Sequence, residues 1–480
     1  MFAAAATVIA TPGLAQRAPT DILPKPAPAA SSAPRPTATS TSTPKSSEPA
    51  AKPTPRIPYD APTPTASAPA PAPSAAPSAA VSATPPQPVV ESVMAWPVRD
   101  AQALLTVIEA IGDEGLIPAD YKPDELRRAI AQGPGQTLDD AASKSFSWLV
   151  EDLRDGRTPM TARLQWFVVD PDQDENPTMA LMAKALQTHD IAGVLNSLAP
   201  THLDFQALKT ALAETPKSDT ATRKLIRANM DRWRWLKRDL GTLYLITNVP
   251  EYQLRLMVRD RVIRSYKTVV GKPGRTATPQ LAEEVEAVVF NPTWTVPQSI
   301  VRGEGLGARL LANPGSARAQ GYRVSRNADG FVTVVQQPGK NNALGLMKID
   351  MPNPHAIYLH DTPSKQTFNL AARAYSHGCI RTERAVELGM TMGMLGAGLT
   401  EAQATEYSNS GKYTRVKMTQ TFPVYITYFT MGRDLSGGLM KFNDLYGRDK
   451  AVLDSFEKPR KEKTTQRSSA EEVIKLDNPL

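Results

Sequence analysis

The apolar positions of this chain follow two different periods, and the change comes near residue 240. Between residues 98 and 215 apolar residues recur every three or four positions, which predicts amphipathic helices. Farther on, short runs rich in β-branched residues alternate between apolar and polar positions and predict strands joined by turns. The predicted strands are 243–249, 253–258, 262–270, 284–290, 331–336, 348–351, 356–360 and 424–429.

The two patterns together predict an α+β protein, in which a helical region precedes a mainly β module. One more helix is predicted at 383–394. A Gly-rich insertion occupies residues 297–345. Long insertions in a compact domain are more often functional than accidental, so this segment is a candidate part of a functional site.

The N-terminal residues differ in composition from the rest. Residues 17–90 contain 20 of the 43 prolines of the chain. Such a stretch cannot bury enough apolar surface to offset its ordering entropy, so we expect 16–94 to be a disordered linker. Residues 1–15 have the apolar run and small residues of a signal peptide but no basic start, so the true start codon is expected upstream.

Charge excludes one class of partner. The formal net charge is +7, and the densest basic run, Lys458–Lys463, lies in a charged C-terminal tail (451–480) with acidic interruptions. This distribution does not predict nucleic-acid binding. Beyond the signal segment no run of 18 apolar residues predicts a membrane span. A mildly basic exported chain is still attracted to carboxylate-bearing cell wall.

Candidate chemistry lies around one thiol. Cys379 is the only cysteine in 480 residues, and His355, His360 and His377 lie within 24 positions before it. A cysteine nucleophile needs a nearby base to form its thiolate. A buried, inert cysteine is the alternative. The His377-Gly378 pair before the thiol suits an exposed tight turn better than a core strand.

A zinc site is a second alternative for these residues. His360, His377 and Cys379 are suitable ligand types, but a fourth ligand and the usual ligand spacings are missing. We therefore expect neither a metal nor a cofactor.

The segment Ser376-His-Gly-Cys-Ile-Arg, preceded by Ile357-Tyr-Leu-His-Asp-Thr-Pro, resembles the active-site signature of the L,D-transpeptidases, whose YkuD catalytic domain cross-links bacterial peptidoglycan. Further blocks resemble the large Gram-negative subgroup, in the same order, over residues 220–450. They are Asn229-Met-Asp-Arg-Trp, Val269-Val-Gly-Lys-Pro, Phe290-Asn-Pro-Thr-Trp, Asn342-Ala-Leu-Gly and Leu445-Tyr-Gly-Arg-Asp.

The resemblance implies a domain plan. A helical scaffold domain would cover 95–225 and the catalytic domain 226–450, with residues 297–345 as a flap over the active site. Members of the subgroup commonly carry a peptidoglycan-binding domain between the two. Here only about a dozen residues, Glu214–Leu225, occupy that place, so wall attachment through such a domain is not expected.

The resemblance also implies roles for the signature residues. Cys379 would be the nucleophile and His360 the base, oriented by the backbone carbonyl of Asp361. The amides of Gly378 and Cys379 would stabilise the oxyanion, and His377 would contribute through its position in the turn.

Three further side chains have two open interpretations each. Arg381 either hydrogen-bonds the backbone of the motif or meets a substrate carboxylate. Tyr358 and Trp294 either line the substrate cleft or belong to the core. His355 is predicted to be a surface or packing residue.

The predicted reaction passes a donor tetrapeptide stem of peptidoglycan through a cysteine thioester to an acceptor amine, in the periplasm. Water as the acceptor would make the protein a carboxypeptidase or another cell-wall hydrolase. The amine of an outer-membrane protein is a third acceptor. A non-catalytic wall-binding scaffold is the alternative outside enzymes, and the intact set of His360, Gly378 and Cys379 disfavours it.

Overall fold

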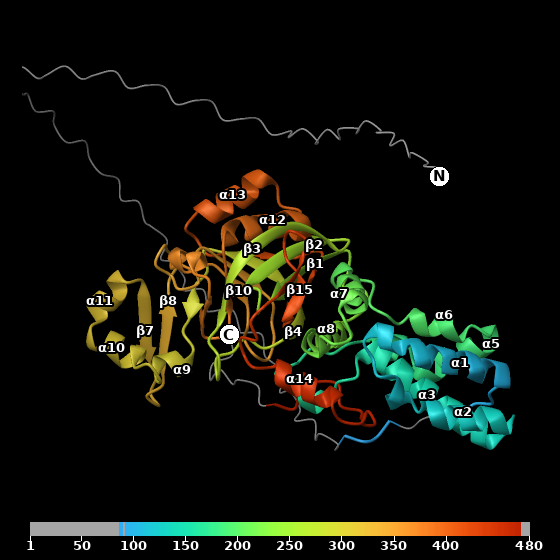
Figure 1. Ribbon diagram of the computed structural model, residues 1–480. Coiled ribbons are helices and arrows are strands. Elements are labelled where there is room, and N and C mark those ends of the chain that lie inside the picture. Colours follow the sequence, from blue (N-terminus) through green and yellow to red (C-terminus); the bar gives the residue numbers. More distant parts are fainter. Residues whose placement is uncertain (1–85, 90–91, 472–480) are drawn as a thin grey trace, which may run out of the picture. The chain divides into compact units, whose positions relative to one another are not determined.

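The computed structural model describes residues 86–89 and 92–471 (Figure 1). The predicted signal peptide, the predicted linker up to residue 85, and residues 472–480 of the predicted tail lie outside the described residues. Within the described part of the chain, no helix has both the length and the apolarity needed to cross a bilayer.

The first half of the described chain is helical, as the apolar periodicity predicts. Of the first six helices, α1, α2, α3, α5 and α6 share one core, which includes Leu104, Phe146 and Leu195. Short 3-10 turns lie at Ile111–Glu114, Pro118–Tyr121 and Met160–Ala162, and a fourth lies in the second half of the chain at Lys365–Asn369. The six helices are α1 (Val98–Ala110), α2 (Pro123–Gln132), α3 (Gln136–Asp155), α4 (Asp172–Glu175), α5 (Thr178–Thr188) and α6 (Ile191–Asn196).

The second half is built on a mixed sheet, so the α+β prediction is confirmed. Its strands run in the order β13-β5-β9-β10-β12-β3-β2-β1-β14-β4, and β11 pairs with β3. They are β1 (Leu243–Asn248), β2 (Gln253–Val258), β3 (Arg261–Gly271), β4 (Leu281–Glu284), β5 (Ala287–Phe290), β9 (Met347–Asp350), β10 (Leu359–His360), β11 (Ala374–Ser376), β12 (Ile380–Thr382), β13 (Thr414–Lys417) and β14 (Pro423–Thr427). A separate hairpin joins β15 (Met431–Arg433) to β16 (Leu439–Lys441).

Both faces of the central strands are buried, because alternate residues enter different cores. Leu245 of β1 packs in the core that also contains Leu388 of α12 (Ala385–Ala397). Its neighbours Tyr244 and Ile246 pack in a second core with α7 (Leu203–Glu214) and α8 (Thr220–Trp233). Helix α13 (Glu401–Asn409) follows α12 and packs against it.

Helix α7 lies before the predicted boundary at residue 225, and α8 crosses it. Phe205 and Leu208 of α7, like Ile226 of α8, share a core with strands of the sheet rather than with α1 to α6. Helical periodicity alone does not say which core a helix will join.

The insertion at 297–345, called the flap below, is a small folded unit. It contains α9 (Gln298–Val301), α10 (Leu306–Ala312), α11 (Pro314–Ala319), β7 (Tyr322–Arg326) and β8 (Val332–Gln336). Strand β6 (Trp294–Thr295) completes a three-stranded sheet with β8 and β7. Figure 1 shows α10 and α11 beside this sheet. Val301, Leu310 and Val334 form the core of the unit.

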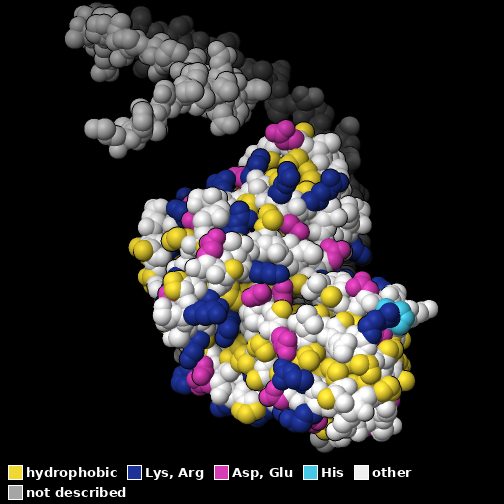
Figure 2. All heavy atoms as spheres, turned by 45° about the vertical axis from the view of Figure 1, so that its right-hand side comes forward, with side chains coloured by type: hydrophobic (Ala, Val, Ile, Leu, Met, Phe, Trp, Pro, Cys, Tyr) yellow, Lys and Arg dark blue, Asp and Glu magenta, His cyan; other side chains and the backbone are white. Residues whose placement is uncertain are grey.

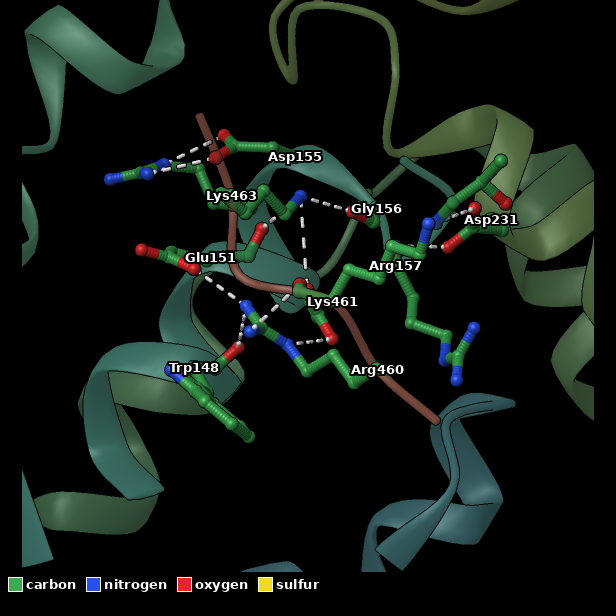
Figure 3. A network of polar contacts seen from close by, with 12 residues as sticks. Trp148, Glu151, Asp155, Gly156, Arg157, Asp231, Arg460, Lys461 and Lys463 are labelled. Carbon is green, nitrogen blue, oxygen red and sulfur yellow. Dashed lines mark hydrogen bonds and ion pairs between the residues drawn. The ribbon is translucent and has the colours of Figure 1, made fainter. Parts of the chain in front are cut away.

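The C-terminal segment after α14 (Asp449–Phe456) packs against the scaffold helices. The guanidinium of Arg460 is buried and pairs with Glu151 (2.5 Å) and Asp152 (2.9 Å) of α3. Figure 3 shows Arg460 and Lys463 reaching from this segment toward α3. Pro88 forms an antiparallel bridge with Thr464, so this end of the predicted linker is paired to the segment that we treated as a charged tail.

We predict that Arg460→Met lowers the free energy of unfolding by about 3–5 kcal/mol, because it leaves the buried Glu151 without its cation and Asp152 with only Lys463, at 3.7 Å. Urea unfolding of the full chain, followed by tryptophan fluorescence, measures the change. The control Lys458→Met alters an exposed side chain in the same segment and should change the free energy by less than about 0.5 kcal/mol. Equal losses in the two variants would contradict the prediction.

Candidate active site

The central feature of the site is a row of side chains across five strands. Backbone pairing joins Val289 of β5 to Lys348 of β9, Lys348 to His360 of β10, His360 to Arg381 of β12, and Arg381 to Val269 of β3. Their sequence neighbours Ile349, Leu359 and Ile380 point into the core on the other face. Since side chains alternate between faces, Lys348, His360 and Arg381 lie side by side.

Cys379 and Tyr358 form the next row on the same face. The amide of Ile380 donates to the carbonyl oxygen of Tyr358 (3.1 Å), which places the thiol beside the tyrosine. The Tyr358 hydroxyl interacts with the sulfur and with the Trp294 side chain. The rings of Tyr358 and His360 meet edge to face, with centroids 5.5 Å apart. The structure thus brings Cys379, His360, Tyr358 and Trp294 together.

The His360 imidazole is buried and uncharged. Its Nδ1 hydrogen-bonds with the backbone carbonyl oxygen of Asp361. Burial, with the nearby charges of Arg381 and Lys348, lowers the pKa of His360 to about 3. The imidazole is therefore neutral at pH 7, and with a proton on Nδ1 its Nε2 presents the lone pair.

Burial raises the pKa of the Cys379 thiol above its ordinary value, although Tyr358, Lys348 and Arg381 oppose that shift. The thiol donates a hydrogen bond to the carbonyl oxygen of Ala356 at 3.6 Å. Thiol and imidazole are thus both uncharged before substrate arrives. The arrangement favours proton transfer during attack over a preformed thiolate–imidazolium pair.

A hydroxyl-rich turn presents the thiol. Gly378 has φ +123°, which side-chain-bearing residues rarely adopt, and a Cβ there would lie 3.1 Å from Ile357 Cδ1. The Ser376 hydroxyl donates to the Cys379 carbonyl oxygen (2.6 Å) and accepts from the Gly378 amide (3.1 Å). Thr278 donates to the Gly378 carbonyl oxygen (2.8 Å). Because the Gly378 amide already has an acceptor, it differs from the free oxyanion donor that we expected.

Other predicted site residues point elsewhere. The exposed His377 ring contacts Glu304 of the flap, with 2.9 Å between Nε2 and Oε1. The Asp361 carboxylate is turned into the protein, where it accepts from the Leu346 amide (3.0 Å) and pairs with Lys365.

Arg381 keeps one polar atom without a partner. Its Nε is buried and has no hydrogen-bond partner within the part of the chain that the structure describes. Among the described residues, its side chain makes no hydrogen bond to the backbone of the motif. His355 is a packing residue, because it is buried with its ring against Phe167.

Sequence reasoning missed three residues of the site. Lys348 begins a predicted strand on the face opposite Ile349, so strand alternation could have singled it out. Its ammonium lies 4.4 Å from the centroid of the Tyr358 ring and 3.4 Å from Asp350. Ser376 lay inside the motif, but we did not consider the two hydrogen bonds that its hydroxyl makes within the turn. Thr278 lies 100 positions before Gly378 and carried no sequence signal. Over residues 86–89 and 92–471, no three His, Cys, Asp or Glu side chains lie together as a metal site.

Comparison with known proteins agrees with this geometry. Residues 242–389 match the model of the L,D-transpeptidase catalytic domain, YkuD, and residues 94–212 match that of the Scaffold domain. Residues 242–389 are therefore similar to the YkuD-type L,D-transpeptidase catalytic domain. All the residues of the row, together with Cys379 and the flap, lie inside the YkuD match.

One curated relative of this chain comes from Haemophilus influenzae and is described as a "Putative L,D-transpeptidase". It is 28% identical over 298 residues, which are 58% of this chain. The alignment spans 60% of the relative's own length.

Solved structures of L,D-transpeptidases resemble the chain more distantly. The Ldtfm–avibactam carbamoyl enzyme is 14% identical, with 40% of this chain and 51% of that chain covered and a TM-score of 0.21. The enzyme from Mycobacterium smegmatis is 14% identical, with 40% and 60% covered and a TM-score of 0.20. LdtMt1 in complex with imipenem is 14% identical, with 39% and 59% covered and a TM-score of 0.20.

We predict that the rate of Cys379 alkylation by iodoacetamide rises with pH without a plateau between about pH 6 and 8. The rate should still rise above the pH at which an ordinary thiol is fully ionised. The reason is the raised pKa of the buried thiol. Lys348→Gln and Tyr358→Phe each remove an interaction that lowers this pKa, so each should slow alkylation several-fold at pH 8. Lys412→Gln, which changes an exposed side chain on another loop, should not. A rate that saturates near neutral pH would reveal a preformed thiolate.

Proposed function

We propose that this protein is a peptidoglycan L,D-transpeptidase that acts through a Cys379 thioester. The observation that carries the proposal is the row Lys348–His360–Arg381 beside Cys379 on one face of the sheet. A nucleophile, a neutral base and two cations within neighbouring strands are what acyl transfer from a stem peptide requires. The YkuD match supports the same conclusion.

In the first half-reaction the Cys379 thiol gives its proton to Nε2 of His360 as sulfur attacks the carbonyl carbon between the third and fourth residues of a donor stem. The C–N bond then breaks. His360 returns the proton to the departing amine, and the terminal D-alanine leaves. The donor stem remains attached to Cys379 as a thioester.

In the second half-reaction the amine of another stem attacks the thioester carbonyl and gives a proton to His360. The C–S bond breaks, and the sulfur recovers the proton from His360. One amide is broken and one is formed, so no other energy source is needed.

Three groups stabilise charge in this scheme. The Cys379 amide is the oxyanion donor that we assign, since the Gly378 amide is held by Ser376. Arg381, with its buried and unpartnered Nε, binds a carboxylate of the stem. Lys348 holds positive charge on the other side of His360 and favours the thiolate.

The proposed location is the periplasm, where the substrate lies. Hydrolysis of the thioester by water, or its transfer to the amine of an outer-membrane protein, uses the same first half-reaction. A single assay separates these alternatives: purified protein is incubated with disaccharide tetrapeptide, and the products are resolved by mass. Cross-linked dimers support transpeptidation, free tripeptide indicates hydrolysis, and unchanged substrate indicates a non-catalytic scaffold.

We predict that Cys379→Ala abolishes cross-linking and that His360→Ala retains almost none, because nucleophile and base act as a unit. His377→Ser should keep a substantial fraction, since its exposed ring contacts the flap rather than the thiol. The same tetrapeptide assay measures all three variants. If His377→Ser is as inactive as His360→Ala, the assignment of the base is wrong.

We also predict that a carbapenem acylates Cys379. The strained lactam carbonyl resembles the stem amide, and the same oxyanion donor would stabilise its tetrahedral adduct. Intact-protein mass spectrometry after meropenem treatment should show one added drug mass on the peptide that contains Cys379. The adduct should be absent in Cys379→Ala and slow in His360→Ala. An unmodified protein that still cross-links stems would contradict the proposed donor site.

A further inference from the structure

The positive charge of this protein is concentrated in the flap. The flap holds six Lys or Arg and two Asp or Glu, a net charge of +4, and residues 17–90 hold six and three, a net charge of +3. Together these two segments equal the formal net charge of +7, so the rest of the chain is balanced. Figure 2 shows Lys and Arg interspersed with Asp and Glu over the face that it draws.

The flap cations are exposed and unpaired. None of the six forms an ion pair or a side-chain hydrogen bond with any part of the chain that the structure describes. Of the two acids, Glu304 is already engaged by His377. The guanidinium of Arg302 stacks on the Phe331 ring, 5.4 Å from its centroid. The six residues are Arg302, Arg309, Arg318, Arg323, Arg326 and Lys340.

The flap carries this charge on a folded base next to the thiol. Its own apolar core orders α10, α11 and the strands β7 and β8. Four of the six cations lie on these elements. Two contacts join the flap side to the site: Glu304 meets His377 of the motif, and Trp294 at the start of β6 meets Tyr358. A polymer that presents one group to Cys379 would therefore pass close to the flap.

We propose that the exposed flap cations dock a peptidoglycan strand through the carboxylates of stems that lie beyond the one in the active site. This inference rests on the proposed function, and it extends the binding surface from one stem to the polymer. Exposed ion pairs are individually weak, so a repeating polyanion that meets several cations at once is the partner that fits.

The surface fits a membrane or a nucleic acid less well. No large hydrophobic side chain of the flap is exposed, although exposed ones occur elsewhere, as at Leu370 and Tyr413. Interfacial membrane binding needs such apolar anchors. Binding of single-stranded nucleic acid needs exposed aromatic platforms, and Tyr322 and Phe331 of the flap are partly buried.

The test is co-sedimentation of the full chain with purified peptidoglycan sacculi, in a Cys379→Ala background so that no bond can form. One variant combines Arg309→Gln, Arg318→Gln, Arg323→Gln and Arg326→Gln. The matched control combines Arg128→Gln, Lys184→Gln, Lys217→Gln and Lys412→Gln, four exposed cations that form no ion pair with described residues. The flap variant and the control are also made with Cys379 retained. In these proteins the unfolding midpoint and the cross-linking of a soluble disaccharide tetrapeptide are compared.

The flap variant should lose about tenfold in affinity for sacculi, and the control less than about twofold. The affinity of the parent should fall steeply with added salt, and that of the flap variant much less. Sacculi with amidated carboxylates should bind the parent as weakly as native sacculi bind the flap variant. Activity on the soluble tetrapeptide should be unchanged, since a single stem engages the active site and not the four substituted flap cations.

Three results would overturn the proposal: equal losses in the two variants, undiminished binding to amidated sacculi, or tighter charge-dependent binding to vesicles of phosphatidylglycerol than to sacculi. Because the binding assay requires no bond formation, its result does not depend on whether the protein catalyses the proposed reaction. A protein that binds sacculi through the flap but produces no cross-links would refute the proposed function alone.

Discussion

The register of three neighbouring strands is the constraint on which the site depends. Pairing of Leu359 with Ile349 and Ile380 buries three apolar side chains in one core. Side chains alternate along a strand, so the same pairing sends His360 and Arg381 to the opposite face. A slip by one residue would exchange the two faces and place charged groups in the core. The free energy gained by burying the core side chains therefore also fixes the positions of His360 and Arg381 on the opposite face.

Burial also decides the protonation states in that line. Loss of water favours the neutral forms of both Cys379 and His360, and the cations Lys348 and Arg381 partly restore the stability of the thiolate. The site thus keeps its nucleophile protonated until a substrate is present. Burial thereby lowers the reactivity of the lone thiol, and in the proposed reaction it couples sulfur attack to proton transfer.

Distant segments are joined by buried polar contacts. Arg460 brings the C-terminal segment to α3, and the Asp231 carboxylate of α8 accepts from the amides of Arg157 (2.6 Å) and Thr158 (3.0 Å) in the chain that follows α3. Such contacts need partners of matching position and charge, so they specify one arrangement of helices and sheet more strictly than apolar packing does. The motif turn is held in the same manner by Ser376 and Thr278.

The sequence by itself determined the α+β order of the fold, most strand positions and the segment that carries Cys379 and His360. Periodicity and local motifs report which face a residue occupies and which chemistry it brings. The tertiary structure alone decided that Lys348 lies beside His360, that Thr278 binds the Gly378 carbonyl oxygen and that Arg460 is buried. The reason is physical: strand partners, hydrogen-bond acceptors and the burial of a charge depend on what lies opposite, and local sequence carries no record of that.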